Sequence, residues 1–355
     1  AIEELYHSVL EAKRTHKLTN RLNIRELSFF GRKQELSQLE EYLSLVETGE
    51  AVGPFLVMGQ SGTGKKRLLR QLVLMSNRSF NFIKAEGKAT SQRYEGSTWN
   101  DLRQALEKLG DEMGISLLEE EDDLISVWNQ LQGLSKEKPL LILLENAQWI
   151  DAVSLEKVKQ LEERRNQEKW QLIFTAEEPL PASFVNFLGS LKVEKRLSQL
   201  ELTNFEPSES RALLKGELGA IEPAVMEQMV EWSEGSPFLL SSYIEEWKEN
   251  ENLEPLPDII QAYLSQELGD MSSEEEALVH YLSCFHKPIS LSILAELTAT
   301  ELPVLTELIE PLSERAIVSI VEEGEALLVQ FCKQLVAMYF YHLLSPARRR
   351  LFHQQ

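Results

Sequence analysis

Residues 59–65, GQSGTGK, have the residue types and the spacing of a phosphate-binding loop. Glycines at Gly59, Gly62 and Gly64 would let backbone N–H groups crowd an anion, and Lys65 could reach its outer oxygens. A short apolar run precedes the loop and a helical pattern follows it, so the positive end of a helix would add to the attraction. The loop therefore predicts a site for a phosphate-bearing ligand. The alternative is a glycine-rich turn that binds nothing.

The residue after the loop lysine departs from this pattern. A Ser or Thr hydroxyl normally follows the lysine and holds the magnesium ion of a bound nucleotide. Here that position is occupied by Lys66. Lys66 and Thr63 are both candidate binding residues. The sequence thus leaves magnesium binding open, and no metal ligand is assigned.

A second candidate feature is the apolar run PLLILLE, which ends at Glu145 about eighty residues after the loop. In enzymes with such a loop, an acidic residue at a strand end holds the water shell of the metal, and a second one polarises the attacking water. Glu145 fills the first position, but the second is Asn146, which cannot take a proton from water. We therefore assign no catalytic residue and expect hydrolysis to be slow or absent.

Lys66 and Glu145 occupy the two positions that would jointly hold magnesium. An ammonium and a carboxylate placed there could pair directly, since such charges attract by roughly 4 kcal/mol at an effective dielectric of about 20. In one hypothesis the lysine replaces the charge of the metal beside a bound phosphate. In the other the pair only fills an empty pocket.

The elements that must position these residues alternate along the chain. Short apolar runs predict strands at 54–58, 80–86, 139–145, 170–178 and 195–205, with helical patterns between the first four of them. Strands that alternate with helices indicate a parallel sheet covered on both faces. After residue 205 the strand signal stops and helical patterns continue.

The predicted fold class is α/β, with a phosphate-loop core followed by an α-helical lid and a winged-helix domain. The parts are a helical linker at 1–28, the core at 29–205, the lid at 206–257 and the winged-helix-like part at 258–355. The last prediction rests on three short helices followed by a hairpin with its turn at Glu323-Gly324. The chain starts without Met and ends within a helical pattern, so we expect it to be a piece of a longer protein.

Composition narrows the classes of partner. The net charge of the 355 residues is -21, which disfavours binding to nucleic acid or anionic lipid. Residues 258–355 alone carry 14 acidic and 6 basic side chains, a net of -8, which argues against DNA binding by that part. No apolar run is long enough to span a membrane, and two distant cysteines suit a reducing compartment. We expect a cytoplasmic protein that binds neither nucleic acid nor membrane.

With these motifs the chain resembles the regulatory AAA/STAND-type ATPase modules fused to bacterial kinases, nucleotide cyclases and LuxR-type regulators. FFGRKQELSQL resembles their first motif, GQSGTGKK their Walker A loop, LILLENAQWID their Walker B strand and SEGSPFLL the Gly-x-Pro motif of their lid. The resemblance implies ATP or ADP as the ligand, with Arg32 and Pro237 beside the base.

The chain departs from this family at four positions. Lys66 replaces the magnesium-binding hydroxyl, Asn146 replaces the second acid, Glu177 replaces a phosphate-sensing Arg, and QFCKQL replaces Phe-x-His. We therefore predict a regulatory nucleotide-binding switch of a signalling protein, with a protein partner or fused effector and weak or no hydrolysis. Two alternatives remain: a pseudo-ATPase scaffold with a vestigial pocket, and a working ATPase whose acid is Glu177, Asp151 or a residue of a neighbouring subunit.

Overall fold

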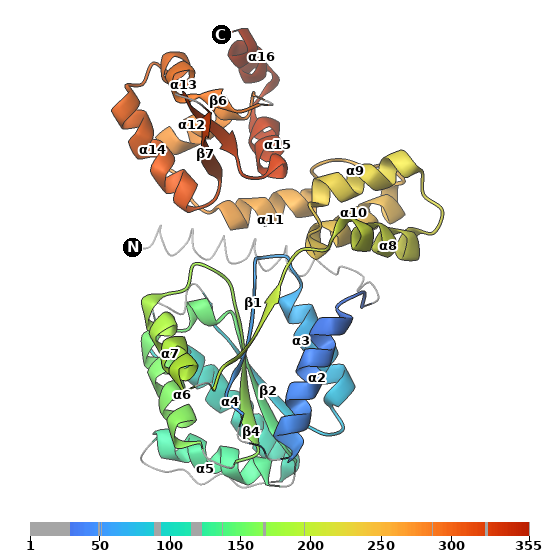
Figure 1. Cartoon of the computed structure of the whole chain (residues 1–355), viewed down its shortest axis with the longest axis vertical. Helices are drawn as coiled ribbons and strands as arrows, with labels where there is room; N and C mark the ends of the chain where they lie inside the picture. The colour runs from blue at the N-terminus through green and yellow to red at the C-terminus, as the bar shows by residue number, and fades with distance from the viewer. Residues whose placement is uncertain are drawn as a thin grey trace, which may run out of the picture. The chain divides into compact units, whose positions relative to one another are not determined.

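The computed structural model describes residues 29–48, 50, 52–88, 94–114, 123–136, 138–165, 168–194, 196–285, 287–323 and 326–354. The predicted linker at 1–28 and Gly324 of the predicted hairpin turn lie outside these residues. The chain forms two compact units (Figure 1). The core unit runs to Glu209 and also takes in Ser236–Phe238, and the second unit comprises Ser210–Gly235 and the chain from Leu239 onward.

The core unit is built on a five-stranded parallel sheet in the order β2-β3-β4-β1-β5. Its strands are β1 (Phe55–Gly59), β2 (Asn81–Glu86), β3 (Leu140–Glu145), β4 (Trp170–Ala176) and β5 (Ser198–Leu202). Four of them lie within the predicted segments and β1 runs one residue past the predicted 54–58, so the predicted α/β phosphate-loop core is confirmed. Every residue of β3 and β4 is buried, as expected of central strands covered on both faces.

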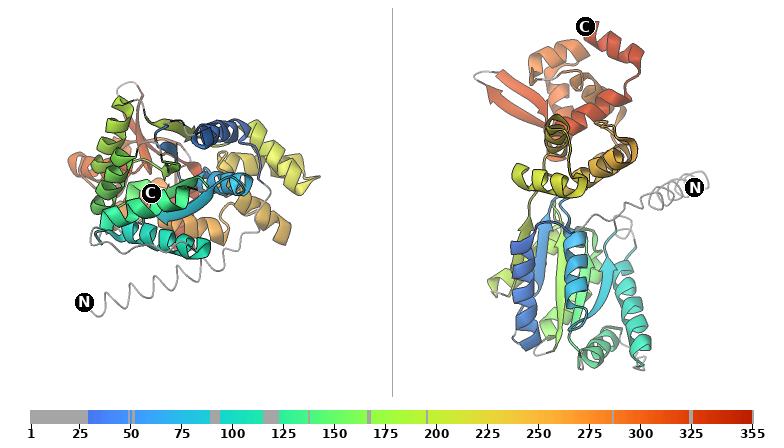
Figure 2. Two further views of the ribbon diagram at one scale, coloured as in Figure 1. Left: turned by 90° about the horizontal axis from the view of Figure 1, so that it is seen from below. Right: turned by 90° about the vertical axis from the view of Figure 1, so that its right-hand side faces the viewer.

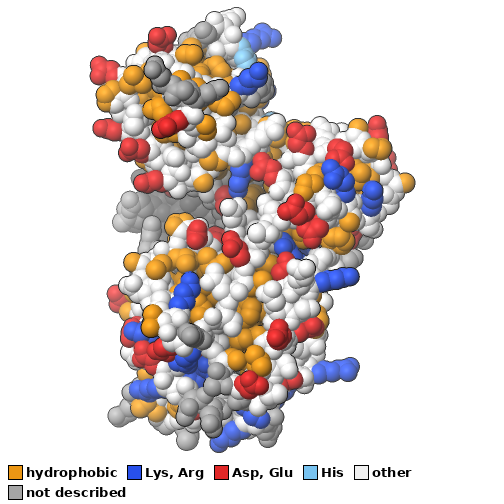
Figure 3. Space-filling view, viewed as in Figure 1, with side chains coloured by type: hydrophobic (Ala, Val, Ile, Leu, Met, Phe, Trp, Pro, Cys, Tyr) orange, Lys and Arg blue, Asp and Glu red, His pale blue; other side chains and the backbone are white. Residues whose placement is uncertain are grey.

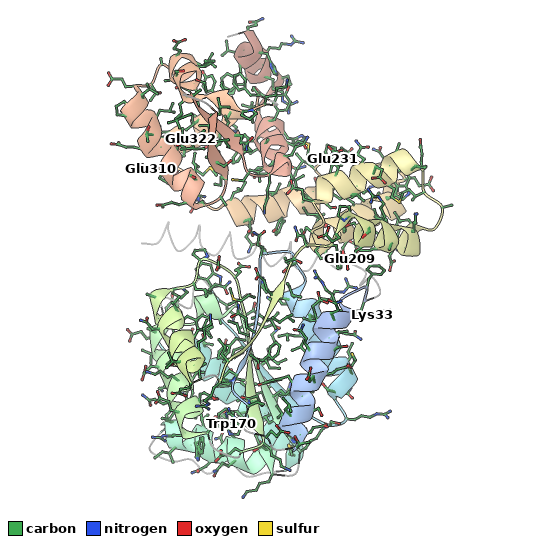
Figure 4. All side chains as sticks on the ribbon, viewed as in Figure 1. Lys33, Trp170, Glu209, Glu231, Glu310 and Glu322 are labelled. Atoms are coloured by element: carbon green, nitrogen blue, oxygen red, sulfur yellow. The ribbon has the colours of Figure 1, made fainter. Side chains whose placement is uncertain are left out.

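Two layers of helices cover the sheet (Figures 1 and 2). One face packs on α2 (Lys33–Thr48) and α3 (Lys65–Ser76). The other face packs on α4 (Ser97–Met113), α5 (Asp123–Ser135), α6 (Ala152–Arg164) and α7 (Ala182–Val193). Alternation along the strands makes this division: Leu141 and Leu143 join the core beneath α2 and α3, whereas Leu140, Ile142 and Leu144 join the core beneath α4–α7. Trp170, labelled in Figure 4, is fully buried in the second of these cores.

The second unit is helical at first and then mixed. Its elements are α8 (Pro207–Leu218), α9 (Pro223–Ser233), α10 (Pro237–Asn250), α11 (Asp258–Leu268), α12 (Ser273–Leu282), β6 (Ile289–Ser290), α13 (Leu291–Thr298), α14 (Leu302–Glu314), β7 (Val318–Glu323), β8 (Ala326–Phe331), α15 (Gln334–Leu343) and α16 (Pro346–Gln354). The three strands form an antiparallel sheet in the order β6-β8-β7. Helices α12, α13 and α14 directly precede the β7–β8 pair, and the winged-helix interpretation of this arrangement stays a prediction, as do the lid boundaries.

The surface of this unit is acidic where α14 faces solvent. Glu307, Glu310 and Glu314 are exposed on this helix beside the apolar side chains of Leu302 and Val304. Figure 4 labels Glu310, and Figure 3 shows acidic side chains scattered over the visible face of the same part. In the described parts of the chain, no helix combines the length and the apolar character that crossing a membrane requires.

A buried charge network fixes the start of β1, the strand that leads into the glycine loop. Glu162 is almost fully buried and accepts hydrogen bonds from Arg165 at 2.8 Å and from Arg196 at 2.6 Å. Arg165 also donates to the carbonyl of Val52 at 2.5 Å. A Cβ on Gly53 would overlap the backbone carbonyl of Arg196. Only glycine therefore fits where the chain passes this network.

We expect Gly53→Ala to lower the free energy of unfolding by about 3 kcal/mol, because the added methyl must displace backbone rather than a flexible side chain. Urea denaturation followed by circular dichroism measures the change. Gly133→Ala in α5 is the matched control, since a Cβ there meets no atom within 4 Å. The control should be unchanged or more stable by about 0.5–1 kcal/mol. Equal stability of the two variants would contradict the assignment.

Candidate functional site

The glycine loop connects β1 to α3, as the sequence predicts. Gly62 and Gly64 have φ angles of 79° and 94°, a region that side chains with a Cβ rarely adopt. Gly64 is the N-cap residue of α3, and no side chain caps the helix there. A Cβ at Gly64 would meet no atom within 4 Å, so the loop is open at this point. Uncapped backbone N–H groups at an open helix start fit the phosphates of a nucleotide.

Close packing holds the two ends of the loop together. A Cβ on Gly59 would come within 2.6 Å of the carbonyl oxygen of Leu202 and within 2.9 Å of Thr63 Oγ1. The Thr63 side chain is buried and its hydroxyl donates to the Gln60 carbonyl at 2.8 Å. Thr63, predicted as a binding residue, thus supports the loop through its side chain.

Lys65 lies inside the loop, and oxygen atoms surround its ammonium group. Nζ donates to the carbonyls of Gly59 at 2.6 Å and Gln60 at 2.9 Å. It also pairs with Glu177 Oε2 at 3.2 Å. The Lys65 side chain is 8 % exposed, so this pairing takes place in a largely enclosed setting. The sequence analysis identified Glu177 as a departure from the family but did not predict its pairing with Lys65.

A four-charge cluster occupies the position where magnesium is expected. Lys66 Nζ lies 2.5 Å from Glu86 Oε1 and 3.7 Å from Glu145 Oε2. Lys84 Nζ lies 2.7 Å from the same Glu145 oxygen, as a charge contact without hydrogen-bond alignment. The predicted proximity of Lys66 and Glu145 is therefore present, although Glu86 is the nearer partner of the lysine. With Lys65 and Glu177 the site contains three ammonium and three carboxylate groups, and its formal charge is zero.

Lys84 and Glu86 were not among the predicted site residues. Both lie on the predicted strand 80–86, and the parallel register places Glu86 directly beside Glu145. Parallel strands end at the same edge of a sheet, so the acidic end of β2 was a usable signal.

Asn146 is tied to the same cluster. Its backbone N–H donates to Thr175 Oγ1 at 3.0 Å, and its side-chain amide donates to Glu86 Oε1 at 2.9 Å. An acidic residue at this position would face the Glu86 carboxylate and be repelled by it. Glu86 itself is engaged by Lys66 and Asn146, which makes it a poor base for activating water.

The residues present do not fit a magnesium ion. Magnesium requires a compact octahedron of oxygen ligands. Here an ammonium group replaces the ligating hydroxyl, and both nearby carboxylates are paired with lysines. The two lysines neutralise the two carboxylates at this position.

Arg32 and Pro237, predicted to flank a base, lie next to the loop. Arg32 Nη2 donates to the carbonyls of Thr203 at 2.6 Å and Thr63 at 3.3 Å, and the guanidinium lies 4.6 Å from the Phe205 ring centroid. Pro237 begins α10, and the next residue, Phe238, donates its backbone N–H to the Gly62 carbonyl at 3.2 Å. Both residues belong to the core unit, and contact with a base stays a prediction for each.

Asp151, an alternative catalytic acid, has a structural role instead. It caps α6 by accepting from the Ser154 N–H at 2.9 Å, and it also accepts from the Gly96 N–H at 2.7 Å. Its side chain is buried. Burial alone raises the pKa of Asp151, but these hydrogen bonds outweigh burial and hold the pKa below its usual value. A buried carboxylate with these partners cannot serve as a base for water.

Comparison with known proteins agrees with this geometry. Residues 28–174 match the AAA ATPase domain family. The Walker-type ATPase PABY2304 of Pyrococcus abyssi is similar in structure, with 18% identity, a TM-score of 0.60, and coverage of 88% of this chain and 96% of that chain. The ORC2 protein of Aeropyrum pernix, solved in ADPNP–ADP complexes, has 15% identity, a TM-score of 0.58, and coverage of 94% and 98%. No curated protein matches the chain in sequence.

A third similar structure is a STAND protein with a tetratricopeptide repeat sensor from Pyrococcus horikoshii. It shares 16% identity over 92% of this chain and 44% of that chain, at a TM-score of 0.41. This likeness is too distant to support a conclusion about the chain. The family match and the first two structures show the fold of an AAA-type ATPase.

Asp151→Asn should lower the free energy of unfolding by about 1–2 kcal/mol near pH 7, because the charged acceptor of three backbone N–H groups, those of Ser154, Gly96 and Thr98, is lost. A depressed pKa stabilises the fold above the unfolded value, about 3.9, and this contribution disappears as pH falls through the folded value. The difference between wild type and variant should therefore shrink below about pH 4. Denaturation across pH checks this. The control is Glu163→Gln, an exposed residue on the same helix, which should cost less than about 0.5 kcal/mol at every pH.

Proposed function

We propose that this AAA ATPase-type module is a regulatory switch that binds ATP or ADP without magnesium and hydrolyses it slowly or not at all. The observation that carries the proposal is an open glycine loop with Lys65 beside a metal position filled by lysines. The first half of that observation fits a nucleotide, and the second half does not fit its usual metal.

The loop supplies the groups that hold phosphate. Backbone N–H groups around Gly62 and Gly64 and the ammonium of Lys65 would bind the phosphate oxygens. Arg32 would support phosphate binding indirectly by holding the loop in place, because its guanidinium donates a hydrogen bond to the Thr63 carbonyl. The ADPNP–ADP complexes of the Aeropyrum pernix ORC2 protein support a nucleotide as the ligand of this fold.

Lys66 and Lys84 would replace the charge of the divalent ion. Two ammonium groups beside Glu86 and Glu145 carry the same +2 charge as magnesium, and they remain in place when ligand leaves. They cannot polarise a phosphoryl oxygen as a Lewis acid does, and no free carboxylate stands at the water-activating position. Slow or absent turnover follows.

The regulatory part of the proposal rests on the contact between the loop and α10. The Gly62 carbonyl accepts from the backbone N–H of Phe238, one residue into this helix. A phosphate bound by the loop would change the loop conformation and hence the energy of this hydrogen bond. The ligand would then shift the equilibrium between the two states of this hydrogen bond by as much as its affinity differs between them.

The second candidate function is a protein-binding scaffold with a vestigial pocket. The exposed acidic and apolar side chains of α14 favour a protein partner over nucleic acid for the second unit. We place the module in the cytoplasm on the same compositional grounds, with a fused or separate signalling partner.

ADP should stabilise the wild-type protein by the same amount in EDTA as in magnesium, and the same should hold for ATP. Ligand at 100 times its Kd adds about 2.7 kcal/mol to the stability of the native state, which a thermal shift detects. Lys65→Ala should abolish the shift, whereas Lys88→Ala, an exposed lysine outside the loop, should retain it. A shift that collapses on chelation would refute magnesium-free binding. No shift with ATP, ADP or AMP would favour the scaffold.

Lys66→Thr should convert the site to magnesium dependence. Without this ammonium, Glu86 and Glu145 repel each other, so nucleotide affinity in EDTA should fall about tenfold and magnesium should restore it. Isothermal titration calorimetry with and without the metal measures both values, with Lys108→Thr on α4 as an exposed control. If the nucleotide affinity of Lys66→Thr is the same with and without magnesium, the replacement of the metal by lysine is contradicted.

A further inference from the structure

The pairing of Lys65 with Glu177 bears on which nucleotide the loop accepts. An ammonium group has three N–H donors, and Lys65 Nζ faces three oxygens: two loop carbonyls and Glu177 Oε2. A phosphate that binds this lysine must displace at least one of them. The two carbonyls are uncharged, so Glu177 is the anionic competitor.

Glu177 is held at this position by the sheet. It follows directly after β4, which lies beside β1, and the register pairs Ala176 with Met58 just before the loop. Its backbone N–H donates to Gln148 Oε1 at 3.3 Å. The carboxylate is thus presented to Lys65 from the strand next to the loop, and its side chain is 28 % exposed.

The Glu177 carboxylate and a terminal phosphate would compete for the ammonium group of Lys65. Both are anions that accept from a lysine, and the loop lysine of such sites reaches the β- and γ-phosphates. Lys66, the next cation, is already paired with Glu86 at 2.5 Å. With a site of zero formal charge, an added phosphate next to Glu177 would face like-charge repulsion.

We propose that Glu177 stands in for the outermost phosphate and makes the site selective for nucleoside diphosphates over triphosphates. A diphosphate would bind the loop N–H groups and share Lys65 with Glu177. A triphosphate would have to expel the carboxylate toward solvent. The inference rests on the proposed nucleotide binding and names which nucleotide that site holds.

The test is a direct binding measurement on the full chain. Isothermal titration calorimetry in EDTA gives the Kd of ADP and of ATP for wild type, Glu177→Gln, Glu177→Ser and Glu178→Gln. Glu178→Gln is the matched control, because it removes the same charge from an exposed neighbouring residue. Thermal midpoints of the unliganded variants show that each is folded.

Wild type should bind ADP about tenfold more tightly than ATP, and both Glu177 variants should reduce this ratio to about threefold or less. The reduction should come from tighter ATP binding, and Glu178→Gln should keep the wild-type ratio. Equal ADP and ATP affinities in wild type, or a ratio unchanged in folded Glu177 variants, would overturn the diphosphate selectivity while leaving nucleotide binding intact. Absence of binding in every variant would overturn both.

Discussion

The edge of the parallel sheet imposes the constraint on which the site depends. The register places Glu86 of β2 beside Glu145 of β3, and Glu145 is only 5 % exposed. Two adjacent carboxylates, one of them buried, require positive charge nearby, because an unpaired buried charge costs several kcal/mol. Lys66 from α3 and Lys84 from β2 supply it. Once two lysines fill this role, an acid at position 146 would add a charge that nothing balances, which accounts for the amide found there.

Lysines and a metal ion differ in whether the positive charge stays in the site when the ligand leaves. A metal leaves with its ligand, whereas Lys66 and Lys84 stay, so the site has a formal charge of zero when it is empty. The salt bridge of Lys66 with Glu86 is half exposed and contributes about 1 kcal/mol or less to stability. Its importance therefore lies in electrostatics at the phosphate position rather than in holding the fold. The position of the second acid holds an amide that cannot take a proton from water, which supports the proposed slow or absent hydrolysis.

The sequence predicted the sheet well, because its strands are short apolar runs bounded by turns. It did not predict α7, whose residues Phe184, Phe187, Leu188 and Leu191 pack in the core beneath β4. Val185 and Val193 are exposed on the same helix, so apolar residues on both faces weaken its helical period. In the site, the loop glycines and the proximity of Lys66 to Glu145 followed from local pattern. The roles of Lys84 and Glu86 and the pairing of Lys65 with Glu177 depend on which strands are neighbours. Strand order cannot be predicted from any single segment of the sequence.

The loop is also the point where distant parts of the core unit meet. Arg32, which precedes α2, joins the Thr63 carbonyl to the Thr203 carbonyl after β5. Phe238, at the start of α10, joins the Gly62 carbonyl. These contacts use loop carbonyls, whereas a phosphate would use loop N–H groups, so ligand and contacts do not compete for the same atoms. A peptide group that turns its N–H toward a phosphate must also turn its neighbouring carbonyl. In the proposed switch, ligand binding would therefore change the hydrogen bond with Phe238 through backbone geometry, without any side chain acting as an intermediary.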